Sequence, residues 1–274
     1  MDFNLKNLIA NALAEDIGNG DITSEATIPA ESTSEAVILA KQHLVLAGID
    51  VAREVFRSLD PGIQFSPFAK DGEVIHAGTE LARLFGNTRA LLAGERVALN
   101  LLQHMSGIAT LTAAYVDKIK GLKAKVLDTR KTLPGLRHLE KYAVRMGGGK
   151  NHRMGLYDMI LIKDNHIKAA GSITKAMESA RKKSGKLTIE VETANLNEVR
   201  EALASKADII LLDNMPLDLM REAVTIIKGQ ALVEASGNVT LDTIRAIAET
   251  GVDYISSGSL THSAPAADIS MKIR

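Results

Sequence analysis

The stretch LTIEVETANLNEVREALASKADIILLDN, residues 187–214, contains the unit on which the fold is built. Its apolar runs at 187–192 and 208–213 predict two strands, and the amphipathic segment 195–205 between them predicts a helix that begins near Asn195. Two strands joined by a helix of this length are typical of a parallel βαβ unit. The stretch therefore predicts a parallel sheet with helices packed along it.

The same alternation continues on both sides of this stretch. Further runs predict strands at 125–129, 159–164, 232–236 and 254–258, and amphipathic segments predict helices at 172–183, 216–228 and 241–250. The last four runs start at residues 187, 208, 232 and 254, so they are 21 to 24 residues apart. This spacing is the repeat length of a compact β/α barrel. We therefore expect the second half of the chain to be an α/β domain.

Polar side chains close all six runs. In chain order they are Thr129, Arg130 and Lys131; Lys163 and Asp164; Glu190 and Glu192; Asp213; Glu234 and Ser236; and Ser256 and Ser257, which Gly258 follows. Active sites of β/α barrels lie where the carboxyl ends of the strands meet. Charges that only mark the exit of a strand into solvent would explain one such run, but six in succession favour a functional site.

The first 105 or so residues follow a different pattern, which predicts a small α+β domain. We expect one strand pair at 36–40 and 44–47, another at 73–77 and 80–85, and a helix at 50–59 between them. The segment 87–121 then predicts a helix that is interrupted near Ser106–Gly107 and leads into the barrel.

The composition narrows the classes of function. The chain has 33 Lys and Arg residues and 33 Asp and Glu residues, and this balance argues against a general nucleic-acid or anionic-membrane binder. It has no cysteine, which excludes disulfides, iron–sulfur clusters, thiolate zinc sites and cysteine nucleophiles. No apolar run approaches the roughly 18 residues of a membrane span, and residues 1–18 lack the pattern of a secretory signal. We therefore expect a cytoplasmic protein with no membrane or nucleic-acid partner.

Basic residues gather between Arg130 and Arg153. This segment holds a single acid, Glu140, against seven lysines and arginines: Arg130, Lys131, Arg137, Lys141, Arg145, Lys150 and Arg153. Guanidinium groups bind carboxylates and phosphates through two parallel hydrogen bonds, so the segment suits a small polyanion. A solvated helix face is the alternative interpretation for Arg137, and it is the one we adopt for Lys141 and Arg145.

Two acids, two glycine turns and one arginine add to this candidate site. Glu192 and Asp213 end adjacent strands, where they suit Mg²⁺ shared with a substrate phosphate, although two solvated acids would give the same pattern. Ser236–Asn238 and Ser257–Ser259 follow late strands, where backbone N–H groups attract phosphate, although either tripeptide alone is compatible with an ordinary turn. Arg96 lies in an apolar helical stretch, where it forms a salt bridge within the chain or is presented at an interface.

Eight motifs of the sequence resemble those of a known family. They are EDIGNGDIT, GERVALNLLQHMSGIAT, LDTRKTLPGLR, GGGKNHRMGLYDMILIKDNHI, IEVET, LLDNM, EASGN and ISSGSLTHSAPAADIS. In this order they resemble quinolinate phosphoribosyltransferase, also called nicotinate-nucleotide pyrophosphorylase (carboxylating). The likeness extends over nearly the whole chain, and the combination of TRKTxPGLR, NHR, IKDNH and EASGN is highly specific.

The resemblance implies a reaction and an architecture. Quinolinate and phosphoribosyl pyrophosphate would give nicotinate mononucleotide, pyrophosphate and CO₂, with Mg²⁺, in de novo NAD biosynthesis. An N-terminal α/β sandwich domain at 1–108, to which residues 267–274 return, would precede an incomplete parallel β/α barrel at 109–266. A homodimer, or a larger assembly of such dimers, is implied as well.

Carried over residue by residue, the resemblance also implies a substrate site. Its residues are Arg96, Thr129, Arg130, Lys131, His152, Arg153, Lys163, Glu192, Asp213, Ser236, Gly237, Asn238, Ser257, Gly258 and Ser259. The implied catalytic residues are Lys131, Lys163, Glu192 and Asp213. Glu192 and Asp213 would face the metal mainly through substrate or water. The turns Ser236–Asn238 and Ser257–Ser259 would bind the 5′-phosphate, and Arg96 would reach the site of the partner subunit.

Two other interpretations stay open at this point. A paralogue of the same fold, a pyrophosphorylase-like protein associated with molybdenum transport, would share much of the sequence, but the full set of cations favours the quinolinate enzyme. A non-catalytic sensor of an anionic metabolite would need these cations more than it would need the acids Glu192 and Asp213.

Overall fold

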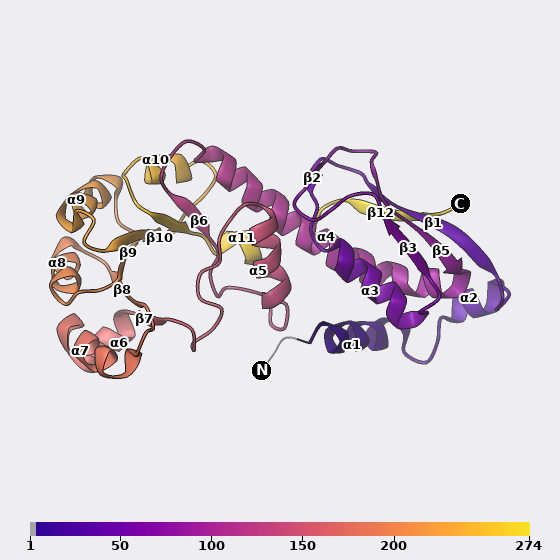
Figure 1. The fold of residues 1–274 in the computed structure, drawn as a ribbon, viewed down its shortest axis with the longest axis horizontal. Coiled ribbons are helices and arrows are strands. Elements are labelled where there is room, and N and C mark those ends of the chain that lie inside the picture. The colour runs from indigo at the N-terminus through magenta and orange to yellow at the C-terminus, as the bar shows by residue number, and fades with distance from the viewer. Residues whose placement is uncertain (1–3) are drawn as a thin grey trace. The chain divides into compact units, whose positions relative to one another are not determined.

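The computed structural model describes residues 4–274, and the chain forms two compact units (Figure 1). The first comprises the residues up to Ala113 together with Leu133–Gly148 and Ser263–Arg274. The second comprises Ala114–Thr132 and Gly149–His262. The 31-residue helix α4 (Thr88–Lys118) contributes to both units.

The first unit combines antiparallel sheets with helices. Besides α4, its helices are α1 (Leu5–Ile17), α2 (Ile22–Thr27), α3 (Ile49–Leu59) and α5 (Arg137–Met146). Its strands are β1 (Thr33–Ala40), β2 (Leu44–Val45), β3 (Gln64–Pro67), β4 (Val74–Ile75), β5 (Glu80–Asn87) and β12 (Ile269–Ile273). They form a four-stranded sheet in the order β12-β1-β5-β3 and a separate pair of β2 with β4.

One apolar core holds this unit together. It contains buried side chains from α1, α3, the sheet and α4, among them Ile9, Phe56, Leu84 and Leu102. Burial of each such side chain contributes about 1.5–3 kcal/mol to folding. Gly94 lets α4 pack closely on α3, because a Cβ atom there would lie 2.9 Å from the ring of Phe56.

The strands expected in this unit exist, but the expected pairing was wrong. Strand β1 pairs with β5 and β12, whereas β2 pairs with β4. At the end of β1 the backbone of Ala40 bonds to Gly78 and Thr79, and the N–H of Lys41 donates to Asp268 O. The chain therefore leaves the first sheet at Ala40 instead of turning back on itself.

The expected interruption of the long helix was also wrong, because α4 continues through Ser106 and Gly107. The Ser106 hydroxyl bonds to the backbone N–H and C=O of Ala47. A Cβ atom on Gly107 would lie only 2.1 Å from the carbonyl oxygen of Pro265. These small residues serve the close approach of other segments and do not end the helix.

The second unit is an open parallel sheet with helices. Its strands are β6 (Lys125–Leu127), β7 (Ile160–Ile162), β8 (Ile189–Thr193), β9 (Ile209–Asp213), β10 (Leu232–Ser236) and β11 (Tyr254–Ser256). Its helices, beyond the end of α4, are α6 (Asp164–Ala170), α7 (Ile173–Ser184), α8 (Leu196–Ala204), α9 (Leu217–Ile227), α10 (Ile244–Ala248) and α11 (Ser259–His262). Helices α7 to α10 lie along one side of this sheet (Figure 1).

The strand order confirms the expected α/β fold with an incomplete barrel. All neighbours in the order β6-β11-β10-β9-β8-β7 run parallel. Strands β6 and β7 follow each other in the sequence but form the two edges, so the sheet stays open. Asn195 caps α8 as predicted, because its Oδ1 accepts hydrogen bonds from the N–H groups of Asn197 and Glu198.

Helix α5 differs in part from its prediction as a solvated basic helix. Arg145 is exposed, as expected, but Lys141 is fully buried. Glu140 on the same helix is fully buried too, and it accepts hydrogen bonds from Leu133 N and pairs with His104 Nε2 at 2.9 Å. The helix buries charged side chains because it packs within the first unit.

None of the helices within residues 4–274 combines the length and the apolar character that crossing a membrane requires.

Candidate active site at the carboxyl ends of the parallel strands

A cavity of about 790 Å³ opens at the carboxyl ends of the parallel strands of the second unit. Its volume is typical of sites that bind small molecules, which span about 300–1,000 Å³. It is lined by every predicted site residue except Arg96: Thr129, Arg130, Lys131, His152, Arg153, Lys163, Glu192, Asp213, Ser236, Gly237, Asn238, Ser257, Gly258 and Ser259. Lining residues that sequence reasoning did not assign to the site include Asn214, Glu234, Thr240 and His262.

Strand periodicity explains why these side chains converge. Successive side chains on a strand point to opposite faces, so residues two apart share a face. Glu192 on β8 and Asp213 on β9 therefore end two neighbouring strands on the cavity side, and Leu211 lines the cavity one step below Asp213.

Lys163 and Glu192 form an ion pair at the mouth of the cavity. The Lys163 Nζ lies 2.6 Å from Glu192 Oε2, and the two side chains are 45% and 16% exposed. Lys163 directly precedes α6, and its backbone N–H donates to His166 Nδ1. The ammonium is thus held beside the acid while it stays open to a ligand.

Two guanidinium groups, those of Arg130 and Arg153, also line the cavity and add positive charge to it. The Arg153 Nη1 donates to Met159 O at 3.2 Å. Partial burial lowers the pKa of Arg153, and the neighbouring charge of Arg130 lowers it further. Two neighbouring positive charges are most stable when an anion lies beside them.

The two glycine turns are shaped by close contacts. Gly237 has φ +96°, and a Cβ atom there would lie 2.2 Å from Asn214 Oδ1. A Cβ atom on Gly258 would lie 2.8 Å from Cδ of Lys131. The first turn therefore needs glycine for its backbone angle and its space. At the second turn, the small Gly258 leaves room for the Lys131 side chain.

The serines around Gly258 bond to each other instead of pointing freely into the cavity. The Ser257 and Ser259 hydroxyls lie 2.7 Å apart, and Ser259 Oγ is also 3.2 Å from Tyr115 OH. We therefore assign ligand contact at this turn to its backbone.

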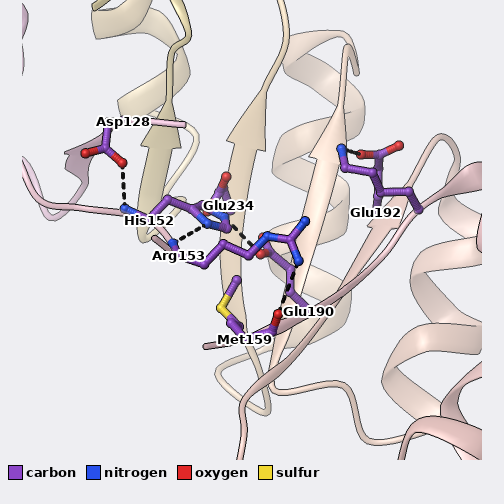
Figure 2. Close-up of polar contacts among 8 residues, drawn as sticks. Asp128, His152, Arg153, Met159, Glu190, Glu192 and Glu234 are labelled. Carbon is purple, nitrogen blue, oxygen red and sulfur yellow. Dashed lines mark hydrogen bonds and ion pairs between the residues drawn. The ribbon is translucent and has the colours of Figure 1, made fainter. Parts of the chain in front are cut away.

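Near Arg153 lies a buried group of carboxylates around His152 (Figure 2). The His152 Nε2 lies 3.0 Å from Glu190 Oε2 and 3.6 Å from Glu234 Oε2. Burial raises the pKa of Glu234, and the negative charge of Glu190 raises it further. Asp128, also fully buried, accepts a hydrogen bond from the backbone N–H of His152 at 2.9 Å. Glu190 and Glu234 were noted in the sequence only as polar residues near strand ends.

Arg96 lies on the part of α4 that belongs to the first unit. Its side chain is 58% exposed, and its Nη2 is 3.5 Å from Glu95 Oε1. An exposed contact of this length contributes little to stability.

Comparisons with known proteins place the chain in a family. The model of the quinolinate phosphoribosyl transferase N-terminal domain matches residues 21–106, and that of the C-terminal domain matches residues 108–272. A Bacillus subtilis relative named probable nicotinate-nucleotide pyrophosphorylase (carboxylating) is 48% identical over 98% of this chain and 93% of its own. A Synechocystis relative of the same name is 50% identical over 95% of this chain and 90% of its own.

A solved structure gives the same result in three dimensions. The crystal structure of NadC from Streptococcus pyogenes superposes with a TM-score of 0.95 at 44% identity, over 99% of this chain and 98% of that one. Because domain models match both halves and relatives of this identity span nearly its whole length, the chain belongs to the quinolinate phosphoribosyl transferase family.

Proposed function

We propose that this protein transfers the phosphoribosyl group of phosphoribosyl pyrophosphate to quinolinate and releases pyrophosphate and CO₂. The product, nicotinate mononucleotide, enters NAD biosynthesis. The proposal rests on one observation. In this member of the family, four basic side chains and two acidic side chains line the same cavity. They are Arg130, Lys131, Arg153, Lys163, Glu192 and Asp213.

The cations match the charge of quinolinate. A dicarboxylate needs more than one positive partner, and guanidinium groups such as those of Arg130 and Arg153 bind carboxylates in a fixed geometry. The pyridine nitrogen already has a free electron pair, so it attacks without a general base. The task of the cavity is to orient that nitrogen toward C1′ of the ribose.

The acids and Lys163 match the charge that develops during transfer. The bond between C1′ and the pyrophosphate oxygen breaks as the bond between nitrogen and C1′ forms, and the ribose becomes cationic on the way. Carboxylates at Glu192 and Asp213 stabilise that cationic ribose, and the Lys163 ammonium stabilises the leaving oxygen.

The loss of CO₂ follows from the transfer itself. Once the ring nitrogen carries a positive charge, it accepts the electron pair left behind when the adjacent carbon–carboxylate bond breaks. A proton from solvent then takes the place of CO₂ on that carbon. The residues around the ring need only hold the second carboxylate in place during this step.

The donor chemistry of Glu192 and Asp213 fits Mg²⁺, which is the metal that we propose. Both offer carboxylate oxygens at the cavity, and neither is fully buried. Mg²⁺ prefers oxygen ligands and is commonly bound by one or two carboxylates together with substrate phosphates. When bound, the ion supplies positive charge that stabilises the departing pyrophosphate.

A side-by-side assay with quinolinate and nicotinate tests the proposed function. With phosphoribosyl pyrophosphate and Mg²⁺, we expect quinolinate to turn over and release its carboxylate carbon as CO₂. Nicotinate leaves part of the cation set unpaired, so its kcat/KM should be at least about 100-fold lower. Equal turnover of nicotinate without CO₂ would refute the proposal.

We also propose a homodimer in which Arg96 completes the site of the partner subunit. Its exposure on α4 and its weak contact with Glu95 support this role. The test mixes Arg96→Ala and Lys163→Ala proteins under conditions of subunit exchange. Random pairing makes half of the dimers mixed, and each then has one intact site, so about a quarter of wild-type activity should return. No recovery, with exchange shown independently, would reject the shared site.

The paralogous molybdenum-associated protein and the non-catalytic sensor are not favoured, since the relatives bear the names of the transferase. The cytoplasmic location stays a prediction, and a rice relative is named as chloroplastic.

A further inference from the structure

One buried phenol contacts the segments that form both glycine turns of the cavity. Tyr115 lies near the end of α4, is 4% exposed and belongs to the second unit, as both turns do. Its hydroxyl lies 3.2 Å from Ser259 Oγ and donates to Val239 O at 3.4 Å. Val239 directly follows the turn Ser236–Asn238, and Ser259 ends the turn Ser257–Ser259. A single hydroxyl therefore reaches both turns.

Two serines of the second turn close a ring of hydrogen bonds with this phenol. Ser257 Oγ lies 2.7 Å from Ser259 Oγ and donates to Val239 O at 3.4 Å. We call this group the hydroxyl ring: the hydroxyls of Tyr115, Ser257 and Ser259 and the carbonyl oxygen of Val239. Each hydroxyl has one proton and the carbonyl has none, so three protons serve the four contacts of the ring.

The burial of these groups makes the ring worth keeping. Ser257 and Val239 are 5% and 7% exposed, and Tyr115 is buried as well. Water has little access to such groups, so a polar atom that loses its partner there is not readily satisfied by solvent. Removal of the phenol hydroxyl therefore leaves the Ser259 hydroxyl and the Val239 carbonyl with one partner fewer each.

The ring joins the two turns beyond the point where their strands pair. Strands β10 and β11 run parallel, and their last paired residues are Ser236 and Ser256. The chain leaves the sheet at these residues and enters the two turns, whose backbone N–H groups can bind a phosphate. N–H groups from two separate turns bind one phosphate well only when the spacing between the turns is fixed.

We propose that Tyr115 is a positioning residue, whose hydroxyl holds the two glycine turns at the spacing at which their backbone N–H groups together bind one phosphate group. The hydroxyls of Ser257 and Ser259 serve the ring and do not bind the phosphate. This inference rests on the proposed function only for the identity of the ligand, which is the 5′-phosphate of phosphoribosyl pyrophosphate.

Hydrogen exchange in a Tyr115→Phe variant reads the spacing of the turns directly. The substitution removes one oxygen atom and keeps the aromatic ring that fills the core. The N–H of Ser257 donates to Leu127 O at 3.1 Å, and the N–H of Thr240 donates to Thr243 Oγ1 at 2.9 Å, so each turn has a protected amide in it or beside it. Such amides exchange when their segment opens locally.

We expect both of these amides to exchange faster in Tyr115→Phe, while the amides of the antiparallel sheet in the first unit keep their wild-type rates. No acceleration at the turns would refute the proposal. Equal acceleration throughout the chain would refute it too, since the hydroxyl would then support only the general stability of the fold.

Binding of two small probes, each measured alone by calorimetry, gives the consequence for the site. Ribose 5-phosphate carries the 5′-phosphate, and benzene-1,2-dicarboxylate carries the two carboxylates of quinolinate without its nitrogen. We expect Tyr115→Phe to raise the Kd of ribose 5-phosphate about 2- to 10-fold, the contribution of one neutral hydrogen bond, and to leave the Kd of the dicarboxylate unchanged. An unchanged Kd for ribose 5-phosphate, an equal loss for both probes, or a wild-type protein that does not bind ribose 5-phosphate would each overturn the proposal.

A double-mutant cycle separates a role through the ring from direct binding by the serine. Ser259→Ala breaks the same ring, so the double variant Tyr115→Phe, Ser259→Ala should bind ribose 5-phosphate about as weakly as the weaker single variant. Fold-losses that multiply in the double variant would show that Ser259 and Tyr115 act independently, and would refute the shared ring.

Tyr142→Phe is the matched control. The Tyr142 hydroxyl donates to Asp71 Oδ2 at 2.8 Å in the first unit. Its loss should lower stability without changing the Kd of ribose 5-phosphate, and a rise equal to that in Tyr115→Phe would refute a specific role for Tyr115. None of these measurements requires turnover. A protein that binds ribose 5-phosphate through the ring but does not convert quinolinate would contradict the proposed function and leave this inference intact.

Discussion

Replacement of Lys163 by alanine separates catalysis from folding most cleanly. The ion pair of Lys163 with Glu192, 2.6 Å between Nζ and Oε2, has one side chain 45% exposed. An ion pair that is this exposed to solvent contributes less than about 1 kcal/mol to the free energy of unfolding. When substrates fill the cavity, the ammonium is shielded from water and its contact with developing negative charge is worth about 2–4 kcal/mol. The variant should therefore lose about 30- to 1,000-fold in kcat.

The loss has a second contribution of the same sign. Without the ammonium, Glu192 keeps a carboxylate that lies only 16% exposed beside two polyanionic substrates. The assay measures initial rates of CO₂ release at saturating substrates and Mg²⁺, together with the thermal midpoint of unfolding. A stability change below about 1 kcal/mol moves that midpoint by no more than about 4 °C in a chain of this size.

Lys168→Ala provides the matched control for this experiment. Lys168 lies on α6, which Lys163 directly precedes, and pairs with Asp164 at 3.1 Å, but both of those side chains are mostly exposed and neither lines the cavity. Its activity and its midpoint should match those of the wild type. A Lys163→Ala protein with a near-normal rate, or one that has lost its fold, would refute the reasoning.

Three further outcomes follow from the same site. Gly237→Ala, which places a Cβ atom 2.2 Å from Asn214 Oδ1 at φ +96°, should cost about 1–3 kcal/mol of stability and raise the KM for phosphoribosyl pyrophosphate; an unchanged midpoint would contradict this. EDTA should abolish turnover and added Mg²⁺ should restore it, whereas full activity in EDTA would argue against the metal. Burial raises the pKa of Glu234 above 4.5, so the folded protein keeps a proton there that the unfolded chain releases above that pH. The unfolding free energy should then fall as the pH rises through and beyond 4.5, and Glu234→Gln should flatten this slope in denaturant titrations.

The strand order could be predicted from the sequence only where strands that are consecutive in the chain also pair in the sheet. In the second unit β8, β9, β10 and β11 are consecutive in the chain and adjacent in the sheet. A run of apolar residues and the helix after it therefore place each strand beside the next. In the first unit Thr33 pairs with Asn87 and Ala36 with Ile273. No local pattern encodes a partner at that separation, so short turns suggested hairpins that do not form.

The buried acids show a limit of another kind. Glu190 and Glu192 are two residues apart on β8, so they share one face of the strand, and Glu190 lies one step deeper. A fully buried carboxylate is stable only with a partner, and that partner, His152, comes from a loop before a different strand. The sequence shows the acid but does not show which histidine lies beside it. The pattern does contain one signal, which is the pair of acids at positions i and i+2 of the same strand. When two acids share one face of a barrel strand, at least one of them lies below the mouth of the cavity. That charge requires a donor from another segment, and a search for such a donor among the histidines and arginines near the other strand ends would have led to His152.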